Sequence, residues 1–256
     1  MLLGADGVEL DVQLSADGEP VVIHDQRVDR TSNGIGYVSD FTAAQLDSLD
    51  AGCRFMRRLK TRPRVRAKIH RLAGQLDGWL LSQGPQPIPR LASVLEFLSN
   101  AQVSRIYVEI KGSPSTRPEL LIKTLRSIQS VGLERVVTLL SFHHSIIGCA
   151  KHVVPGVRTA ITIPGLVRRL PTARSIIQAA GAFNADEVAI HFSIASPRLV
   201  SALHQRGFQV SAWTANRTLI MKRLIALGVD SIMTNHVDRL RSIVGDSYNP
   251  GSVDTR

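Results

Sequence analysis

The stretch GVELDVQLSADGEPVVIHD, residues 7–25, sets two acids into a segment that begins with the pattern of a buried strand. Successive side chains of a strand point to opposite faces, so Glu9 and Asp11 share one face while the apolar residues around them share the other. Two carboxylates that face one enclosed space repel each other, so one must take a proton or a cation must bind between them. Carboxylate oxygens suit a hard divalent ion such as Mg²⁺ or Ca²⁺. A strand with one solvent-facing side explains the same alternation, and both interpretations stay open for this segment alone.

A hairpin is expected directly after this strand. The sequence SADG at 15–18 supplies a turn, and it is too short for a parallel crossover, which needs a dozen or more residues. We therefore expect residues 20–24 to return antiparallel to the first strand.

Beyond residue 91 the chain alternates between helical segments and strands. LHQRG at 203–207, for example, ends a helical pattern on glycine and precedes the strand pattern FQVSAWTAN. Repeated units of this kind predict a parallel sheet. A (β/α)₈ barrel needs eight parallel strands, so the count of seven leaves two alternatives, an open sheet or a barrel whose first β/α unit lies before Met1. The candidate strands are 7–14, 105–111, 136–141, 157–163, 186–192, 208–215 and 230–234.

Length and composition predict one large α/β domain over residues 1–256. The chain is 44% hydrophobic, which is enough to bury a full core. Its two cysteines, Cys53 and Cys149, have no paired spacing, which argues against a disulfide framework or a thiolate zinc site. No apolar run has the length needed to cross a bilayer. The N-terminus lacks the pattern of a secretory signal, so we expect a cytoplasmic protein.

The net charge of +10 is unevenly distributed. Residues 1–50 hold ten Asp or Glu against two Arg, whereas residues 53–71 hold nine Arg or Lys and no acid. Such a run suits nucleic acid, an anionic membrane or a phosphorylated substrate, and a solvated, partly disordered loop is the alternative. No aromatic ladder or nucleic-acid motif accompanies it, so we expect no specific nucleic-acid partner. Prolines at 63, 85, 87 and 89 predict that residues 52–90 are loop-like, and we interpret 53–87 as a basic insertion.

A second strand repeats the acidic pattern of the first. RIYVEIKG at 105–112 places Tyr107, Glu109 and Lys111 on one face. In a barrel, inward side chains near the C-terminal ends of strands line the active site. Glu9, Asp11 and Glu109 would then supply three acids for a metal, and Lys111 one ammonium for an anion. A structural Lys–Glu pair is the alternative for the second strand.

His24 ends the expected hairpin in VVIHD. A histidine beside a metal-bound phosphate can act as a general acid or base near neutral pH. A polar loop position explains a single histidine equally well.

Taken together, these residues resemble the glycerophosphodiester phosphodiesterase family. The E-x-D pair, the D-G turn and the H-D pair of GADGVELDVQLSADGEPVVIHDQRVDRTSNGIG, residues 4–36, fall at the family's spacing. Further matching blocks run through nearly the whole chain: LDAG at 49–52, IPRLASVLEFL at 88–98, VEIKG at 108–112, SF at 141–142, SAWTAN at 211–216 and GVDSIMTN at 228–235.

The resemblance implies a TIM-like barrel and the hydrolysis of a glycerophosphodiester to sn-glycerol 3-phosphate and an alcohol. It also implies roles for individual residues. A divalent cation, Mg²⁺ or Ca²⁺, would be held by Glu9, Asp11 and Glu109. His24 would be catalytic, Lys111 would bind phosphate, and Trp213 would line the substrate cleft.

The sequence also departs from the family. Family members carry an earlier strand that ends in His-Arg-Gly, followed by Pro-Glu-Asn at a helix start, and the 256 residues contain neither. We therefore expect a TIM-like (β/α)₈ barrel that lacks its first β/α unit and has an antiparallel hairpin near the N-terminus. The alternatives are a catalytically impaired truncated barrel and a phospholipase D-like enzyme on the same fold. A nucleic-acid binder is a weaker alternative.

Overall fold

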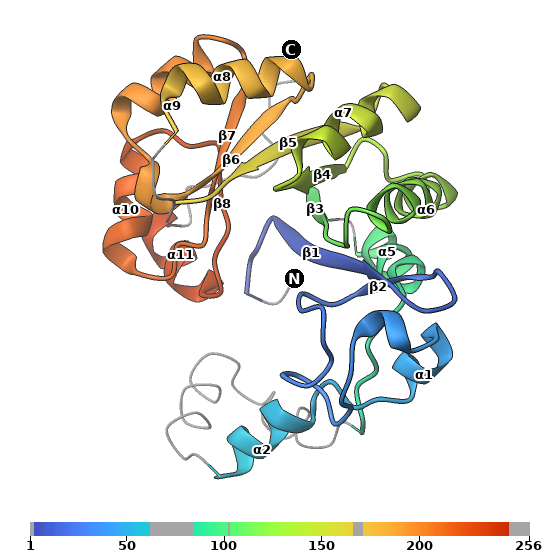
Figure 1. The fold of residues 1–256 in the computed structure, drawn as a ribbon. Coiled ribbons are helices and arrows are strands. Elements are labelled where there is room, and N and C mark those ends of the chain that lie inside the picture. The colour runs from blue at the N-terminus through green and yellow to red at the C-terminus, as the bar shows by residue number, and fades with distance from the viewer. Residues whose placement is uncertain (1–2, 62–83, 102, 166–170, 246–256) are drawn as a thin grey trace. The chain divides into compact units, whose positions relative to one another are not determined.

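The computed structural model describes residues 3–61, 84–101, 103–165 and 171–245, which form alternating strands and helices (Figure 1). The strands are β1 (Gly7–Leu14), β2 (Pro20–Val22), β3 (Arg105–Ile110), β4 (Val137–Ser141), β5 (Arg158–Ile163), β6 (Glu187–His191), β7 (Gln209–Trp213) and β8 (Ser231–Ile232). The helices are α1 (Ala43–Asp47), α2 (Cys53–Thr61), α5 (Leu91–Asn100), α6 (Arg117–Ser130), α7 (His144–Val153), α8 (Ala173–Ala182), α9 (Pro197–His204), α10 (Thr218–Ala226) and α11 (Val237–Val244). Two short 3₁₀ helices, Val38–Asp40 and Phe192–Ile194, complete the described elements.

The strands are hydrogen-bonded in the order β2-β1-β3-β4-β5-β6-β7-β8. From β3 to β8 each strand pairs in parallel with the next, as expected where a helix follows nearly every strand. β2 pairs antiparallel with β1, with Val12 opposite Val22 and Leu14 opposite Pro20. The α/β class and the mostly parallel sheet are therefore confirmed. The absence of a first β/α unit, like the single domain over 1–256, stays a prediction.

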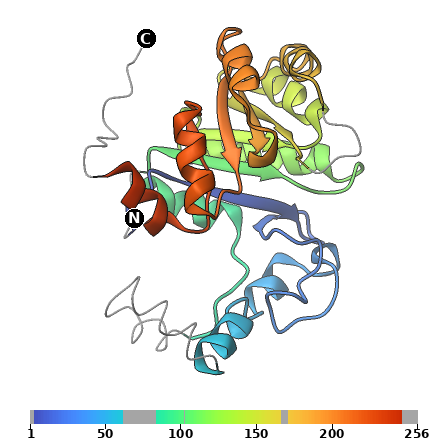
Figure 2. The same ribbon diagram turned by 90° about the vertical axis from the view of Figure 1, so that its left-hand side faces the viewer.

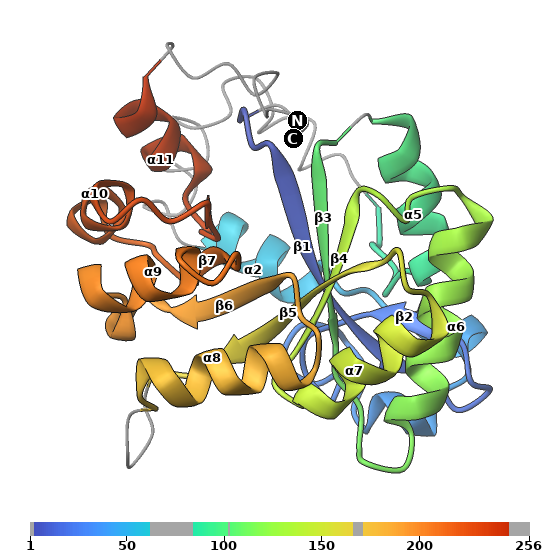
Figure 3. The ribbon, with the colours of Figure 1, turned by 90° about the horizontal axis from the view of Figure 1, so that it is seen from above.

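Contacts divide the chain into two compact units, and the first holds most of the parallel sheet. It comprises Met1–Leu10, Phe97–Ile110 and Ile128–Arg256. Helices α7, α8 and α9 pack against its strands (Figure 3). The apolar side chains of these strands and helices interlock in one core, with Ile161, Val188 and Val210 on the sheet side and Ile176 and Leu203 on the helix side. Helices α10 and α11 pack against each other in the same unit (Figure 2).

The second unit comprises Asp11–Glu96 and Lys111–Ser127. Its separate apolar core gathers residues of the hairpin, the following loop, α1 and the segment before α5, among them Val21, Val28, Leu46 and Ile88. The backbone N–H of Val22 donates to the carbonyl of Pro89, which ties the hairpin to the segment before α5. The hairpin that carries His24 is therefore anchored on both sides, by β1 and by this segment.

The expected loop over 52–90 is wrong in its first part, because α2 occupies Cys53–Thr61. Arg, Met, Leu and Lys are strong helix formers, and this stretch contains neither glycine nor proline. The prolines that suggested a loop begin only at Pro63. Residues 62–83 of the expected insertion lie outside the described residues.

The start of β1 lies very close to the start of β3. A Cβ atom added at Gly7 would lie 2.3 Å from the carbonyl oxygen and 3.1 Å from the carbonyl carbon of Arg105. The N–H of Ser104 donates to the carbonyl of Asp6 beside this point. Because the obstructing atoms belong to the backbone, no side-chain rotation can make room, and only glycine fits.

Replacing Gly7 by Ala should therefore separate the two strands locally and destabilise the chain by about 1–3 kcal/mol, the usual cost of overpacking. Chemical denaturation followed by circular dichroism measures this loss. Gly181→Ala is the matched control, since Gly181 is helical and has no atom within 4 Å of an added Cβ, and we expect it to be neutral or slightly stabilising. Equal stability of the two variants would contradict the close approach.

Candidate active site

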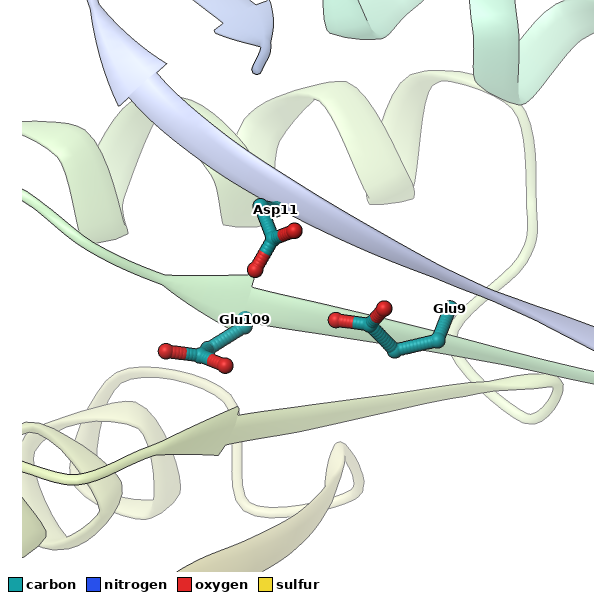
Figure 4. A group of neighbouring side chains, drawn as sticks. All are labelled: Glu9, Asp11 and Glu109. Carbon is teal, nitrogen blue, oxygen red and sulfur yellow. The ribbon is translucent and has the colours of Figure 1, made fainter. Parts of the chain in front are cut away.

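Three acidic side chains from β1 and β3 come together. Glu9, Asp11 and Glu109 each offer one carboxylate oxygen, and these oxygens all lie within 4.8 Å of one another (Figure 4). Glu9 is exposed, Asp11 half-buried and Glu109 buried, with 8% of its surface accessible. The alternation of side chains along each strand produces this arrangement, because Glu9 and Asp11 are two residues apart on β1 and β3 is the neighbouring strand. Such a set of oxygens matches the ligands that hard divalent cations prefer.

Lys111 directly follows β3, and its ammonium lies beside this acidic group. Its Nζ lies 3.0 Å from Oδ1 of Asp11. The main chain at this point is held twice, since the N–H of Lys111 donates to the carbonyl of Val12 and Arg117 Nε donates to the carbonyl of Lys111. The side chain of Lys111 is 20% accessible, so its charge stays within reach of a ligand.

His24 follows β2, and its backbone is held against β1. The N–H of Ile23 donates to the carbonyl of Asp11, and the buried amide of Gln13 donates to the carbonyl of His24. The imidazole is 62% accessible, and its Nδ1 lies 2.7 Å from Oδ1 of Asp25. The contact with Asp25 occupies Nδ1, and Nε2 takes no part in it.

Asp25 is in turn held by Arg30. The guanidinium binds both carboxylate oxygens, with Nη2 3.0 Å from Oδ1 and Nε on Oδ2. This bidentate contact, with a smaller contribution from His24, lowers the pKa of Asp25 to about 2. Asp25 belongs to the H-D pair and Arg30 to the matching block 4–36, but the sequence alone assigned a role to neither.

Trp213 ends β7 and belongs to the first unit. Its ring packs over a buried cluster of Tyr107, Leu140, Ala160 and Ala189, and its Nε1 donates to the carbonyl of Ala189 at 3.1 Å. The side chain is half-buried at the C-terminal end of the parallel strands, which is the end where ligands bind in such sheets.

The opposite end of β3 carries a second set of polar groups with a different character. Tyr107 Oη donates to Oε1 of Glu187 at 2.8 Å, and Arg105 Nη1 lies 3.1 Å from Oε2 of the same carboxylate. Burial, followed by the charge of Glu187, raises the pKa of Tyr107 to about 12. These groups neutralise one another, so they fasten β3 to β6. The 82 residues that separate Arg105 from Glu187 leave no local pattern by which the sequence could have predicted the pair.

The structure thus brings together the three predicted acids and places Lys111 on one of them, while His24 and Trp213 stand on the hairpin and on β7. Their individual roles stay predictions. No helix among the described residues is long and apolar enough to span a membrane.

Comparison with known proteins identifies similar chains over nearly the full length. Residues 1–239 match the model of the glycerophosphoryl diester phosphodiesterase family. The chain is 32% identical to the glycerophosphodiester phosphodiesterase of Caldanaerobacter subterraneus subsp. tengcongensis, a match that covers 95% of this chain and 88% of that protein. It is 29% identical to the glycerophosphodiester phosphodiesterase of Bacillus altitudinis, over 92% of this chain and 85% of that one.

Several solved structures share the fold of this chain. A glycerophosphodiester phosphodiesterase from Agrobacterium tumefaciens matches with a TM-score of 0.69 and 24% identity, covering 93% of this chain and 87% of that one. A phosphodiesterase from Oleispira antarctica, solved in complex with the product sn-glycerol 3-phosphate, matches with a TM-score of 0.75 and 21% identity over 94% of this chain and 86% of that one. These likenesses support an α/β barrel-like fold.

The bidentate contact of Arg30 yields a prediction about Asp25. Because the pKa of Asp25 is lower in the folded chain than the ordinary 3.8, the carboxylate stabilises the fold above about pH 4 and loses this effect as the pH falls toward 2. Arg30→Gln should shift the pKa of Asp25 back toward 3.8, as measured by carboxyl ¹³C NMR. Arg198→Gln on α9, a change of the same chemistry at an exposed position, should leave it in place. A pKa of Asp25 that is the same in both variants would refute the contact.

Proposed function

The chain belongs to the glycerophosphoryl diester phosphodiesterase family and is a phosphoric diester hydrolase, and we propose that it hydrolyses glycerophosphodiesters to sn-glycerol 3-phosphate and an alcohol with a bound divalent cation. The observation that carries the proposal is the group of three carboxylate oxygens within 4.8 Å, with Lys111 against one of the acids.

A divalent cation fits this group for electrostatic reasons. Carboxylates at such separations repel one another, and a cation bound between them removes this repulsion. Asp11 has two oxygens with several lone pairs, so it can contact Lys111 through Oδ1 and still offer the other oxygen to a cation. Glu9, Asp11 and Glu109 would hold the ion, and Mg²⁺ or Ca²⁺ suits an all-oxygen set. When bound, the cation would neutralise phosphate oxygens and favour attack at phosphorus.

Lys111 would bind the phosphodiester anion. A phosphodiester carries one negative charge on its two unesterified oxygens, and this charge grows on the phosphorus oxygens during attack. An ammonium held in advance by its backbone stabilises that charge without reorganisation. Trp213 would cover an apolar part of the substrate at the C-terminal end of the sheet.

His24 would transfer the proton that hydrolysis requires. Asp25 occupies Nδ1, so Nε2 would protonate the departing alkoxide or accept a proton from the nucleophile. Such general acid–base catalysis contributes about 10²–10⁴-fold to the rate.

The relatives support the substrate class. The similar proteins of Caldanaerobacter subterraneus and Bacillus altitudinis are glycerophosphodiester phosphodiesterases. The Oleispira antarctica enzyme, which shares the fold, was solved with sn-glycerol 3-phosphate. That product is the fragment common to all the substrates proposed for this chain.

Removal of one carboxylate tests the cation site. Asp11→Asn should weaken Mg²⁺ and Ca²⁺ binding at least about 10-fold, since even outer-sphere partners of metal ligands have effects of that size. Calorimetric titration with each ion measures the affinity, and release of sn-glycerol 3-phosphate from glycerophosphocholine measures the activity. Both should fall together.

Glu119→Gln is the matched control, because this α6 residue is exposed and pairs with Lys123 one helical turn away. It should bind both ions as the unaltered chain does. Undiminished affinity in the Asp11 variant would remove Asp11 from the cation site.

Replacement of the histidine separates proton transfer from cation binding. His24→Gln should lower kcat by about 10²-fold or more while calorimetry shows cation affinity unchanged, because the imidazole is not among the proposed ligands. A variant that keeps its full kcat would exclude His24 as the acid or base. Loss of cation affinity would instead make it part of the metal site.

A further inference from the structure

Three rings meet at the C-terminal end of the parallel strands in the first unit. His191 and Trp213 are paired as the last residues of β6 and β7, and their rings lie 5.1 Å apart and nearly perpendicular. Phe142, directly after β4, also lies edge to face with Trp213, with 5.4 Å between the ring centroids. We call Phe142, Trp213 and His191 the ring wall.

The ring wall stands beside the acidic strand β3. Ser141, the neighbour of Phe142, donates from its hydroxyl to the carbonyl of Ile110, the residue after Glu109. Tyr107, on the same face of β3 as Glu109, belongs to the buried cluster over which Trp213 packs. A molecule bound at Glu109 would therefore have the ring wall alongside it.

His191 is the member of the wall whose ring can supply a polar contact. Phe142 has no polar side-chain atom, and Trp213 already donates its indole N–H to the carbonyl of Ala189. Within the part of the chain that the structure describes, Nε2 of His191 forms no hydrogen bond.

The contacts of the ring fix its tautomer. The backbone N–H of Ser193 donates to Nδ1 of His191 at 3.3 Å, and the Ser193 hydroxyl lies 2.7 Å from the same nitrogen. A backbone N–H can only donate, so Nδ1 carries a lone pair and the proton resides on Nε2. Burial lowers the pKa of His191, which keeps the ring neutral at pH 7. His191 thus presents a neutral N–H donor at the edge of an otherwise apolar wall.

We propose that His191 determines substrate specificity by donating a hydrogen bond from Nε2 to a hydroxyl group of the bound glycerophosphodiester, whose carbon chain lies against Phe142 and Trp213. This inference rests on the proposed function, because it assigns the surroundings of the same substrate. Such a wall favours a ligand that carries an alcohol group. The carbon atoms of the ligand contact the rings, and its hydroxyl oxygen accepts the Nε2–H of His191. The hydroxyl belongs either to the glycerol arm or to the alcohol that is released.

The test must separate this role from a structural one, because His191 also begins the short 3₁₀ helix Phe192–Ile194 through its bond from Ser193. His191→Asn serves this purpose. Asparagine is a strong capping residue whose side-chain oxygen can accept the same backbone N–H, while the ring and its Nε2 donor are lost. Thermal denaturation should show little change.

Steady-state kinetics on four substrates then locates the hydroxyl. Glycerophosphocholine and glycerophosphoethanolamine carry hydroxyls only on the glycerol arm, whereas glycerophosphoglycerol and glycerophosphoinositol carry them on both arms. A contact with the glycerol arm predicts a fall in kcat/KM of about 3- to 10-fold for all four, the size expected for one neutral hydrogen bond. A contact with the released alcohol predicts that fall for the latter two alone.

Binding of sn-glycerol 3-phosphate by calorimetry gives a readout that does not depend on turnover. Its affinity falls in His191→Asn if the glycerol arm is contacted and stays unchanged if the released alcohol is. His204→Asn, on α9 and paired with Asp230, is the matched control and should alter none of these values. Unchanged kcat/KM on all four substrates in the His191 variant would overturn the inference. Absence of hydrolysis by the unaltered chain, with normal product binding, would instead count against the proposed function.

Discussion

Along a β-strand every second side chain points to the same face, and the site depends on this constraint more than on any single contact. This alternation places Glu9 and Asp11 on one face of β1, and Glu109 and Lys111 on one face at the end of β3. A shift of β1 or β3 by one residue would move the charged side chains of that strand to its other face. Gly7 protects that register at the start of β1, where the carbonyl of Arg105 leaves no room for a side chain.

The two ends of β3 show how the same kinds of residue serve stability and chemistry. At the first end, Tyr107 and Arg105 satisfy the buried carboxylate of Glu187, and the polar groups neutralise one another. At the second end, the carboxylate oxygens of Glu9, Asp11 and Glu109 lie within 4.8 Å of one another, with Lys111 against Asp11. A buried ion pair that is balanced contributes packing and register. Several carboxylate oxygens gathered at one point match the ligands of a hard cation, and this grouping distinguishes the candidate site from the Arg105–Glu187 pair.

The histidines owe their chemical character to short local contacts. Arg30 binds the carboxylate of Asp25, and this carboxylate contacts Nδ1 of His24. Nε2 of His24 takes no part in that contact. The backbone N–H of Ser193 donates to Nδ1 of His191, so the proton of this ring resides on Nε2. The partner of the first ring is an anion and that of the second an amide, which is why the first suits proton transfer and the second suits recognition by a neutral donor.

The sequence by itself determined the strands, the α/β class and the face on which each acid stands, because these follow from short-range alternation and turn chemistry. It predicted Glu9, Asp11, Glu109 and Lys111 as one group, and the structure brings their side chains together. It did not predict α2, because the prolines from Pro63 onward indicated a loop although Cys53–Thr61 consists mostly of good helix formers. Only the tertiary structure paired Arg105 with Glu187 and set His191 beside Trp213. Such contacts join positions tens of residues apart through the order and register of the strands, and no local pattern in the chain encodes that order.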